Sequence, residues 1–206
     1  IGTTTLVLYF YNIITKEIIT IQSEKNKQSA YGTDLFERLD FHCNNEDKGI
    51  LQRIIINQIN EIIISVCNDY NFDYNQITRL VITGNTLMLH LISGIDVSSA
   101  ATSLLFPMSL FGIEERAMKL GLNVNQKATV YLSQCVCGLI GGDITTGLLA
   151  CNMDKDTRNI LYLDIGTSSK IVLKANDDIY CCVSIASHAF ECIGISNGMI
   201  AKTGAI

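Results

Sequence analysis

Two short stretches, far apart in the chain, repeat one pattern. Residues 163–169 read LDIGTSS and residues 1–5 read IGTTT. Each stretch joins apolar strand residues to a glycine and a group of hydroxyl side chains. Glycine allows a tight turn and a close approach of the backbone to a ligand. The N–H groups and hydroxyls that follow it can all direct hydrogen-bond donors at one anion.

We therefore predict that the two stretches form hairpins that bind a polyphosphate from both sides, with the two glycines at facing turns. Asp164 ends an apolar strand just before the second glycine, where a carboxylate needs a partner or a metal. We expect it to hold Mg²⁺ through water. Read singly, each stretch is also compatible with an ordinary Gly-Thr turn. The predicted phosphate ligands are Gly2, Thr3, Thr4, Thr5, Gly166, Thr167 and Ser168.

The remaining sequence alternates between strand patterns and helix patterns, which predicts an α/β or α+β fold. β-Branched and aromatic runs indicate strands, and apolar residues at a period of 3.6 indicate helices. The strands are expected at 3–11, 17–22, 80–83, 128–132, 160–165, 170–174 and 179–184. The helices are expected from an N-cap at Thr33 to Leu39, from Asp47 to 66, at 86–92 after an N-cap at Asn85, and from Asp143 to Cys151.

Composition and spacing exclude several classes of protein. The net charge of −5 argues against a sequence-independent nucleic-acid binder, which needs a basic face. No uninterrupted apolar stretch reaches the ~20 residues that cross a bilayer, so we expect a cytoplasmic protein with no membrane contact. None of the eight cysteines forms a C-x-x-C pair, so we expect neither an iron–sulfur cluster nor zinc. Rossmann and P-loop signatures are also missing.

Several further residues are candidates for chemistry. Asp143 follows two glycines and opens a helix, so it is either an N-cap or a carboxylate that orients an attacking water or a Mg²⁺-bound water. We predict a catalytic role for it. The turn Thr83-Gly84-Asn85 is expected to line the cleft. His90 lies among apolar helix residues and is interpreted as a satisfied core histidine, whereas His188 and Glu191 are too few to define a site.

Longer phrases around these residues resemble one known family. They are Ile1-Gly2-Thr3-Thr4, Tyr31-Gly32-Thr33-Asp34, Ile82-Thr83-Gly84-Asn85-Thr86, Gly141-Gly142-Asp143-Ile144-Thr145-Thr146, Leu163-Asp164-Ile165-Gly166-Thr167 and Ala189-Phe190-Glu191. In this order they resemble the phosphate-1, connect-1 and phosphate-2 segments of the acetate and sugar kinase, heat-shock chaperone and actin superfamily. Within it they resemble the ATP-dependent reductive activators of corrinoid-dependent methyltransferases and corrinoid iron–sulfur proteins.

The resemblance implies two ribonuclease-H-like lobes of the actin type, one over residues 1–152 and the beginning of another over 153–206. It also implies ATP and Mg²⁺ as ligands and a corrinoid protein as partner, and it leaves a homodimer open. We expect a fragment of a longer protein, with little turnover by this part alone. Ser168-Ser169-Lys170 stands where the family usually has Asn-Gly-Glu. A non-catalytic binding module therefore remains the alternative, with a small-molecule kinase behind it.

Overall fold

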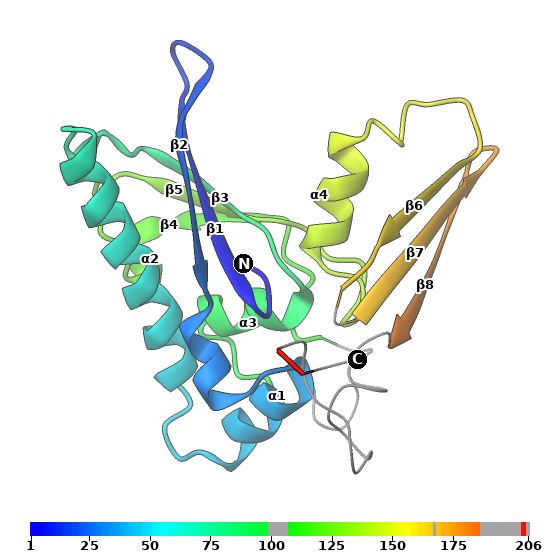
Figure 1. The fold of residues 1–206 in the computed structure, drawn as a ribbon, viewed down its shortest axis with the longest axis horizontal. Coiled ribbons are helices and arrows are strands. Elements are labelled where there is room, and N and C mark those ends of the chain that lie inside the picture. The colour runs from blue at the N-terminus through cyan, green and yellow to red at the C-terminus, as the bar shows by residue number, and fades with distance from the viewer. Residues whose placement is uncertain (99–106, 167, 186–202, 205–206) are drawn as a thin grey trace. The chain divides into compact units, whose positions relative to one another are not determined.

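The structure, a computed structural model, describes residues 1–98, 107–166, 168–185 and 203–204 (Figure 1). The chain divides into two compact units, Ile1–Thr146 and Gly147–Ile206. Helices and strands alternate within the first unit, and three strands dominate the second. The expected mixture of helices and sheets is therefore confirmed, while the division at residue 152 stays a prediction.

The first unit begins with the expected hairpin. Strands β1 (Thr5–Asn12) and β2 (Glu17–Lys25) pair antiparallel, with a register shift between Phe10 and Tyr11. Side chains alternate across the hairpin, so Leu6 and Phe10 are buried on its inner face. This burial anchors a hairpin that would be marginally stable alone.

A three-stranded sheet forms the other β structure of this unit. Its order is β3 (Arg79–Ile82), β5 (Thr129–Leu132), β4 (Ile113–Arg116), with β3 parallel and β4 antiparallel to the central strand. The sequence predicted β3 and β5 but missed β4. That strand reads IEER, so it lacks the alternation of apolar residues that marks a half-buried strand.

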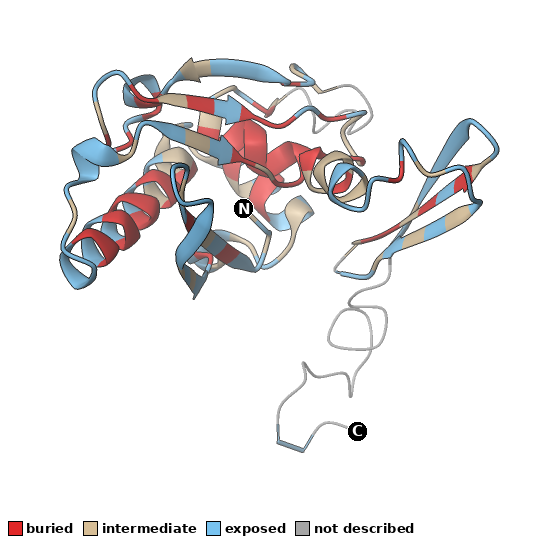
Figure 2. Ribbon diagram, turned by 90° about the horizontal axis from the view of Figure 1, so that it is seen from above, coloured by how far each residue is buried: buried red, intermediate tan, exposed pale blue. Residues whose placement is uncertain are grey.

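Among the described residues, three α-helices lie wholly within the first unit, namely α1 (Leu35–Asn44), α2 (Ile50–Asp69) and α3 (Thr86–Ser93). Their buried positions follow one side of α2 and most of α3 (Figure 2). Helix α2 is long and apolar enough to cross a membrane by length and composition alone. Core helices pass the same test, and half of the most apolar window of α2 is buried inside the protein. Short 3₁₀ turns occupy Lys27–Tyr31, Tyr74–Gln76 and Ala117–Leu120.

Two helix starts differ from the predictions. Asp34, not Thr33, is the N-cap of α1, since its carboxylate accepts from the N–H of Glu37 at 2.9 Å. Thr33 instead donates its N–H and its hydroxyl to the Glu37 carboxylate. Helix α2 begins three residues after Asp47, which caps the preceding turn by accepting from the N–H of Gly49. Both misplaced caps lie in polar runs where several side chains can accept a backbone N–H.

The apolar core of the first unit has two parts. The larger one joins α2 to β1, β3, β5 and the segment after β4 through residues such as Leu6, Ile59, Ile82 and Val130. The smaller one joins α1, α2 and α3. Together they fix the ends of β1, β3 and β5 relative to one another.

The second unit is a β-meander preceded by the end of helix α4 (Gly142–Ala150). Strands β6 (Ile160–Asp164), β7 (Ser168–Ala175) and β8 (Asp178–Ile185) pair antiparallel in sequence order, as predicted. Buried Lys174 on β7 donates to the carbonyls of Met153 and Asp154, at 2.9 and 3.2 Å, and to that of Asp156. One lysine thereby holds the turn between α4 and β6.

Candidate phosphate-binding site

The first glycine–hydroxyl stretch forms a tight turn that leads into β1. Gly2 donates its N–H to the carbonyl of Thr5 at 2.9 Å. A Cβ at Gly2 would lie 2.8 Å from that same carbonyl oxygen, so only glycine fits without a shift. Gly2, Thr4 and Thr5 are exposed, and Thr3 is half-buried. The turn is therefore compact and open to a ligand.

The carbonyls of this turn are held from within the protein. Asn26 donates its Nδ2 to the carbonyl of Gly2 at 2.9 Å, and its backbone N–H to that of Thr4 at 2.8 Å. The guanidinium of Arg38 donates to the carbonyl of Thr3. Among the described residues, the N–H groups of Thr3 and Thr4 donate to no partner. Two backbone donors are thus available on an exposed turn, which is the arrangement that binds anions.

A second turn lies against the first one. Asn85 caps α3 by accepting from the N–H of Met88 at 3.0 Å, and its Nδ2 donates to the hydroxyl of Thr3 at 3.1 Å. The N–H of Asp143 donates to the carbonyl of Gly84 at 3.1 Å. The structure therefore brings together three predicted groups, the Gly2–Thr5 turn, the Thr83–Asn85 turn and Asp143.

Glycines permit this close approach at the start of α4. A Cβ at Gly141 would lie 2.6 Å from the Cα of Asn85, and one at Gly142 would lie 1.9 Å from the hydroxyl of Ser133. Ser133 follows β5 and donates to the hydroxyl of Thr83 at 3.0 Å, and the hydroxyls of Thr83 and Thr146 are also 3.0 Å apart. These hydroxyls connect the ends of β3 and β5 to α4.

Asp143 is half-buried beside these turns. One of its carboxylate oxygens accepts from the N–H of Ile144 at 3.0 Å. Asp143 is the second residue of α4, and the carbonyl of Gly141 accepts the first helical N–H groups, so the N-cap interpretation of Asp143 is wrong. A carboxylate in the first helical turn is still favourable there. A carboxylate at this position is of the type that orients water or a hydrated Mg²⁺.

The second glycine–hydroxyl stretch lies in the other compact unit. Asp164 is half-buried at the end of β6, Gly166 is exposed and Ser168 begins β7. Thr167 lies outside the described residues. Apart from its chain neighbours, no described residue has an atom within 4 Å of a Cβ placed on Gly166, in contrast to Gly2. The prediction that Gly2 and Gly166 face each other stays a prediction.

The strand pairing of the meander places a lysine opposite Asp164. Asp164 of β6 pairs directly with Lys170 of β7, and Lys170 is buried. Side chains of directly opposed residues lie on the same face of an antiparallel pair. A cation therefore shares the face of the predicted Mg²⁺ ligand.

His90 is a core histidine, as interpreted from the sequence. Its Nδ1 lies 2.7 Å from the carbonyl of Thr86, and its Nε2 accepts from the N–H of Ser109 at 3.1 Å. These partners fit the neutral ring, and burial lowers the pKa of His90 against the raising effect of the Thr86 carbonyl. His188 and Glu191 lie outside the described residues.

Metal ligands do not gather in the part of the chain that the structure describes. There, no group of three or more histidine, cysteine, aspartate or glutamate side chains is placed to hold a metal ion. Burial raises the pKa of the Cys135 thiol, which disfavours the thiolate needed by zinc or iron. The expected absence of zinc and iron–sulfur clusters stays a prediction.

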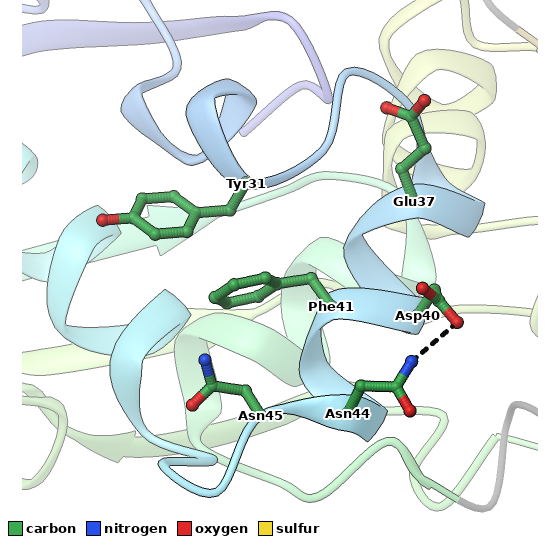
Figure 3. Close-up of a pocket in the computed structure, with 6 residues that line it drawn as sticks. All are labelled: Tyr31, Glu37, Asp40, Phe41, Asn44 and Asn45. Carbon is green, nitrogen blue, oxygen red and sulfur yellow. Dashed lines mark hydrogen bonds between the residues drawn. The ribbon is translucent and has the colours of Figure 1, made fainter.

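A separate surface hollow lies beside α1. It has a volume of about 370 Å³ and is lined by Tyr31, Glu37, Asp40, Phe41, Asn44 and Asn45. The rings of Tyr31 and Phe41 lie 4.9 Å apart, and Asn44 donates to Asp40 at 2.9 Å (Figure 3). Its acidic and aromatic lining is unsuited to phosphate, so the hollow is distinct from the site at Gly2–Thr5.

Two residues of the site were missed from the sequence alone. Asn26 is a polar residue in a loop, and Arg38 is one arginine in a helix, so neither residue type by itself indicates a site. A signal for Arg38 was present in the Tyr31-Gly32-Thr33-Asp34 phrase. A Cβ at Gly32 would lie 2.5 Å from the backbone nitrogen of Arg38, and the carbonyl of Gly32 accepts from its Nε at 2.9 Å.

One protein-family model matches most of this chain. A family model described as the RACo middle region matches residues 1–156. The chain belongs to the RACo family. A second model, described as the C-terminal domain of RACo, the ASKHA domain, matches residues 158–206. The resemblance to the actin and sugar-kinase superfamily, and to the reductive activators within it, is confirmed.

Three individual proteins are also similar to this chain. The corrinoid activation enzyme RamQ of Eubacterium limosum is 31% identical over 207 residues, which cover 100% of this chain and 35% of RamQ. A [Co(II) methylated amine-specific corrinoid protein] reductase of Methanosarcina barkeri is 26% identical over 193 residues, covering 85% of this chain and 33% of the reductase. A solved structure of a reductive activator for corrinoid, iron-sulfur protein matches with a TM-score of 0.87 and 32% identity, covering 100% of this chain and 33% of that one. The chain thus spans about a third of the length of these relatives.

Proposed function

We propose that this chain is the phosphate-binding part of an ATP-dependent reductive activator of a corrinoid protein. The observation that carries the proposal is the Gly2–Thr5 turn, whose Thr3 and Thr4 N–H groups are without partners among the described residues. Membership of the RACo family and the names of the relatives supply the corrinoid partner.

The residues of the first unit have distinct roles in this proposal. The N–H groups and hydroxyls of Thr3 and Thr4 bind phosphate oxygens, and Asp143 orients the attacking water. Asn85 positions the hydroxyl of Thr3, to which it is hydrogen bonded. Positioning and fixed dipoles are the main contributions a protein makes to phosphoryl transfer.

The predicted ligands of the second unit have their own roles in the proposal. The backbone at Gly166 and the hydroxyl of Ser168 bind phosphate oxygens, and Asp164 holds Mg²⁺ through water. When bound, Mg²⁺ neutralises the charge that develops on the phosphate oxygens. Carboxylate oxygens are the ligands that this ion prefers.

The test uses the full-length protein and its corrinoid partner. We expect ATP hydrolysis that the partner stimulates, and its loss in Asp164→Asn and in Asp143→Asn. Asp156→Asn is the matched control, because Asp156 pairs with the exposed Arg158 and is not one of the proposed ligands. Full hydrolysis by Asp164→Asn would show that this carboxylate is not the metal ligand. No binding of ATP by the wild type would overturn the proposed function.

A binding module without turnover is a second candidate, favoured by Lys170. The lysine lies opposite Asp164, where its charge competes with a cation for that carboxylate. In this case the full-length protein binds ATP but does not hydrolyse it. Replacement of Lys170 by glutamate, the residue of the resembled family, is then expected to restore Mg²⁺-dependent turnover.

A further inference from the structure

Arg38 is an unusual residue to find beneath an exposed turn. Its side chain is 0% exposed, which makes it the largest fully buried side chain of the described residues. None of the ion pairs among those residues includes it. Arginine is almost never fully buried without a paired charge, because the loss of hydration is costly.

The partners of Arg38 are neutral groups. Its Nε donates to the carbonyl of Gly32 at 2.9 Å, its Nη1 lies 3.4 Å from the side-chain oxygen of Gln28, and its Nη2 donates to the carbonyl of Thr3. Burial lowers the pKa of Arg38 to about 10, against the raising effect of nearby Asp34, so the guanidinium stays charged at neutral pH. A full positive charge therefore lies directly behind the Gly2–Thr5 turn, and no ion pair among the described residues includes it.

The bond to Thr3 also sets the direction of a peptide group. In a trans peptide the C=O and the following N–H point in opposite directions, and no cis peptide is present in the described part of the chain. Because Arg38 holds the Thr3 carbonyl inward, the N–H of Thr4 points away from Arg38. In the same way Asn26 holds the Gly2 carbonyl, so the N–H of Thr3 points away from Asn26.

We propose that Arg38 and Asn26 are positioning residues for a phosphate group. Arg38 aims the N–H of Thr4 outward and Asn26 aims that of Thr3. The proposal rests on the proposed function, since it names the residues that organise the same phosphate site. The ligand class is a polyphosphate, which accepts both N–H bonds and leaves the guanidinium as a charge behind the turn rather than a direct contact.

The test is titration of the ¹⁵N-labelled 206-residue chain with inorganic tripolyphosphate, followed by the amide signals of Thr3 and Thr4. In the wild type both signals shift and saturate together. Arg38→Lys keeps the charge but cannot hold the Gly32 and Thr3 carbonyls with one planar fork. We expect about tenfold weaker binding, with the phosphate-induced shift lost mainly at Thr4.

Asn26→Ser is the second variant. Serine keeps the N-cap of the 3₁₀ turn that Asn26 starts, but it lacks the Nδ2 donor. Here the shift is expected to be lost mainly at Thr3. The two variants are thus expected to affect different amide signals, that of Thr4 in Arg38→Lys and that of Thr3 in Asn26→Ser. A general loss of structure would affect both signals in both variants. Arg53→Lys, in an exposed pair with Asp47, is the matched control and leaves the titration unchanged.

The outcomes separate the two proposals. Equal titrations of the wild type, Arg38→Lys and Asn26→Ser would overturn the positioning roles and leave the phosphate site intact. No saturable shift at Thr3 or Thr4 of the wild type would overturn the phosphate site and the positioning roles together. If Arg38→Lys does not fold, unaltered titration of Asn26→Ser still contradicts the proposal.

Discussion

At the scale of single residues, the candidate site depends on positions where no residue larger than glycine fits without a shift of its neighbours. A Cβ added at Gly2 or Gly141 would lie less than 3.0 Å from backbone atoms, whereas one at Gly166 would meet no other described residue within 4 Å. The same residue type thus serves two purposes. At positions 2 and 141 the lack of a Cβ avoids a steric clash with backbone atoms, whereas at position 166 the described residues leave room for a Cβ.

Replacement of Gly141 by alanine tests the first purpose. The new Cβ would lie 2.6 Å from the Cα of Asn85 and 2.7 Å from the nitrogen of Thr86. Both atoms are backbone atoms, so we expect a loss of about 1–3 kcal/mol in the free energy of unfolding, measured by urea denaturation. Gly166→Ala is the control and is expected to leave the free energy of unfolding unchanged. An equal loss in both variants would contradict the steric argument.

His90 makes stability depend on pH. Its pKa in the folded protein is lowered by burial below the ordinary value of 6.5. The unfolded chain therefore binds more protons as the pH falls below about 6.5, and the free energy of unfolding decreases there. Well above pH 6.5 His90 is neutral in both the folded and the unfolded protein, so its titration no longer lowers the free energy of unfolding. We expect His90→Gln, whose amide can donate to Thr86 and accept from Ser109, to flatten this part of the profile. An unchanged slope between the two proteins would show that another group titrates.

At the scale of elements, caps and turns connect the strands to the site. Asn85 caps α3 and also donates to the hydroxyl of Thr3, so one side chain serves both the helix and the Gly2–Thr5 turn. Gly94 ends the same helix in the left-handed conformation, at φ 71°, which suits glycine. In the second unit Lys174 holds the turn after α4 by donating to its backbone carbonyls.

The two roles of Asn85 can be separated by two substitutions. Asn85→Ala removes the cap and is expected to cost about 1 kcal/mol of stability. Asn85→Asp keeps an acceptor for the N–H of Met88, so stability stays close to that of the wild type. It loses the donor to Thr3 and adds a negative charge beside the turn, so tripolyphosphate binding weakens more than in Asn85→Ala. Thermal unfolding and calorimetric titration measure the two effects. Tighter binding by Asn85→Asp would contradict the phosphate assignment.

Lys174→Met tests the corresponding element of the second unit. The carbonyls of Met153, Asp154 and Asp156 lose their common donor, and a buried carbonyl without a partner costs about 1–3 kcal/mol. We expect a decrease of this size in the stability of the meander, measured by hydrogen exchange at β7. Lys119→Met, in an exposed pair with Glu115, is the control and is expected to change little.

At the scale of the whole molecule, the proposed ligand contacts are divided between two compact units. A ligand that binds only the folded protein stabilises it by mass action, by about 2.7 kcal/mol at a concentration of 100 times Kd. We expect Mg-ATP to raise the melting temperature of the full-length protein, and Asp164→Asn to remove the Mg²⁺-dependent part of this rise. The same rise in the variant would show that Asp164 does not bind the ion. ATP without Mg²⁺ is the control for both proteins.

The sequence by itself indicated the family and most of the helices and strands, and it named candidate site residues that stay predictions. Repeated Gly-Thr phrases, helical periodicity in Ile50–Asp69 and the Asn85 cap are local patterns, and each acts over a few neighbouring residues. The strand β4 could not be predicted in this way, because its residues are held by pairing with β5 rather than by their own pattern.

Only the tertiary structure decided what lies behind the Gly2–Thr5 turn. Arg38 and Asn26 are 35 and 24 residues away from the carbonyls they hold. Their roles come from burial and from the direction of peptide groups, which no spacing in the sequence encodes. Lys170 opposite Asp164 is a further case, since a register becomes known only when two strands pair. Long-range hydrogen bonds depend on how the elements pack, so they are decided by the fold as a whole.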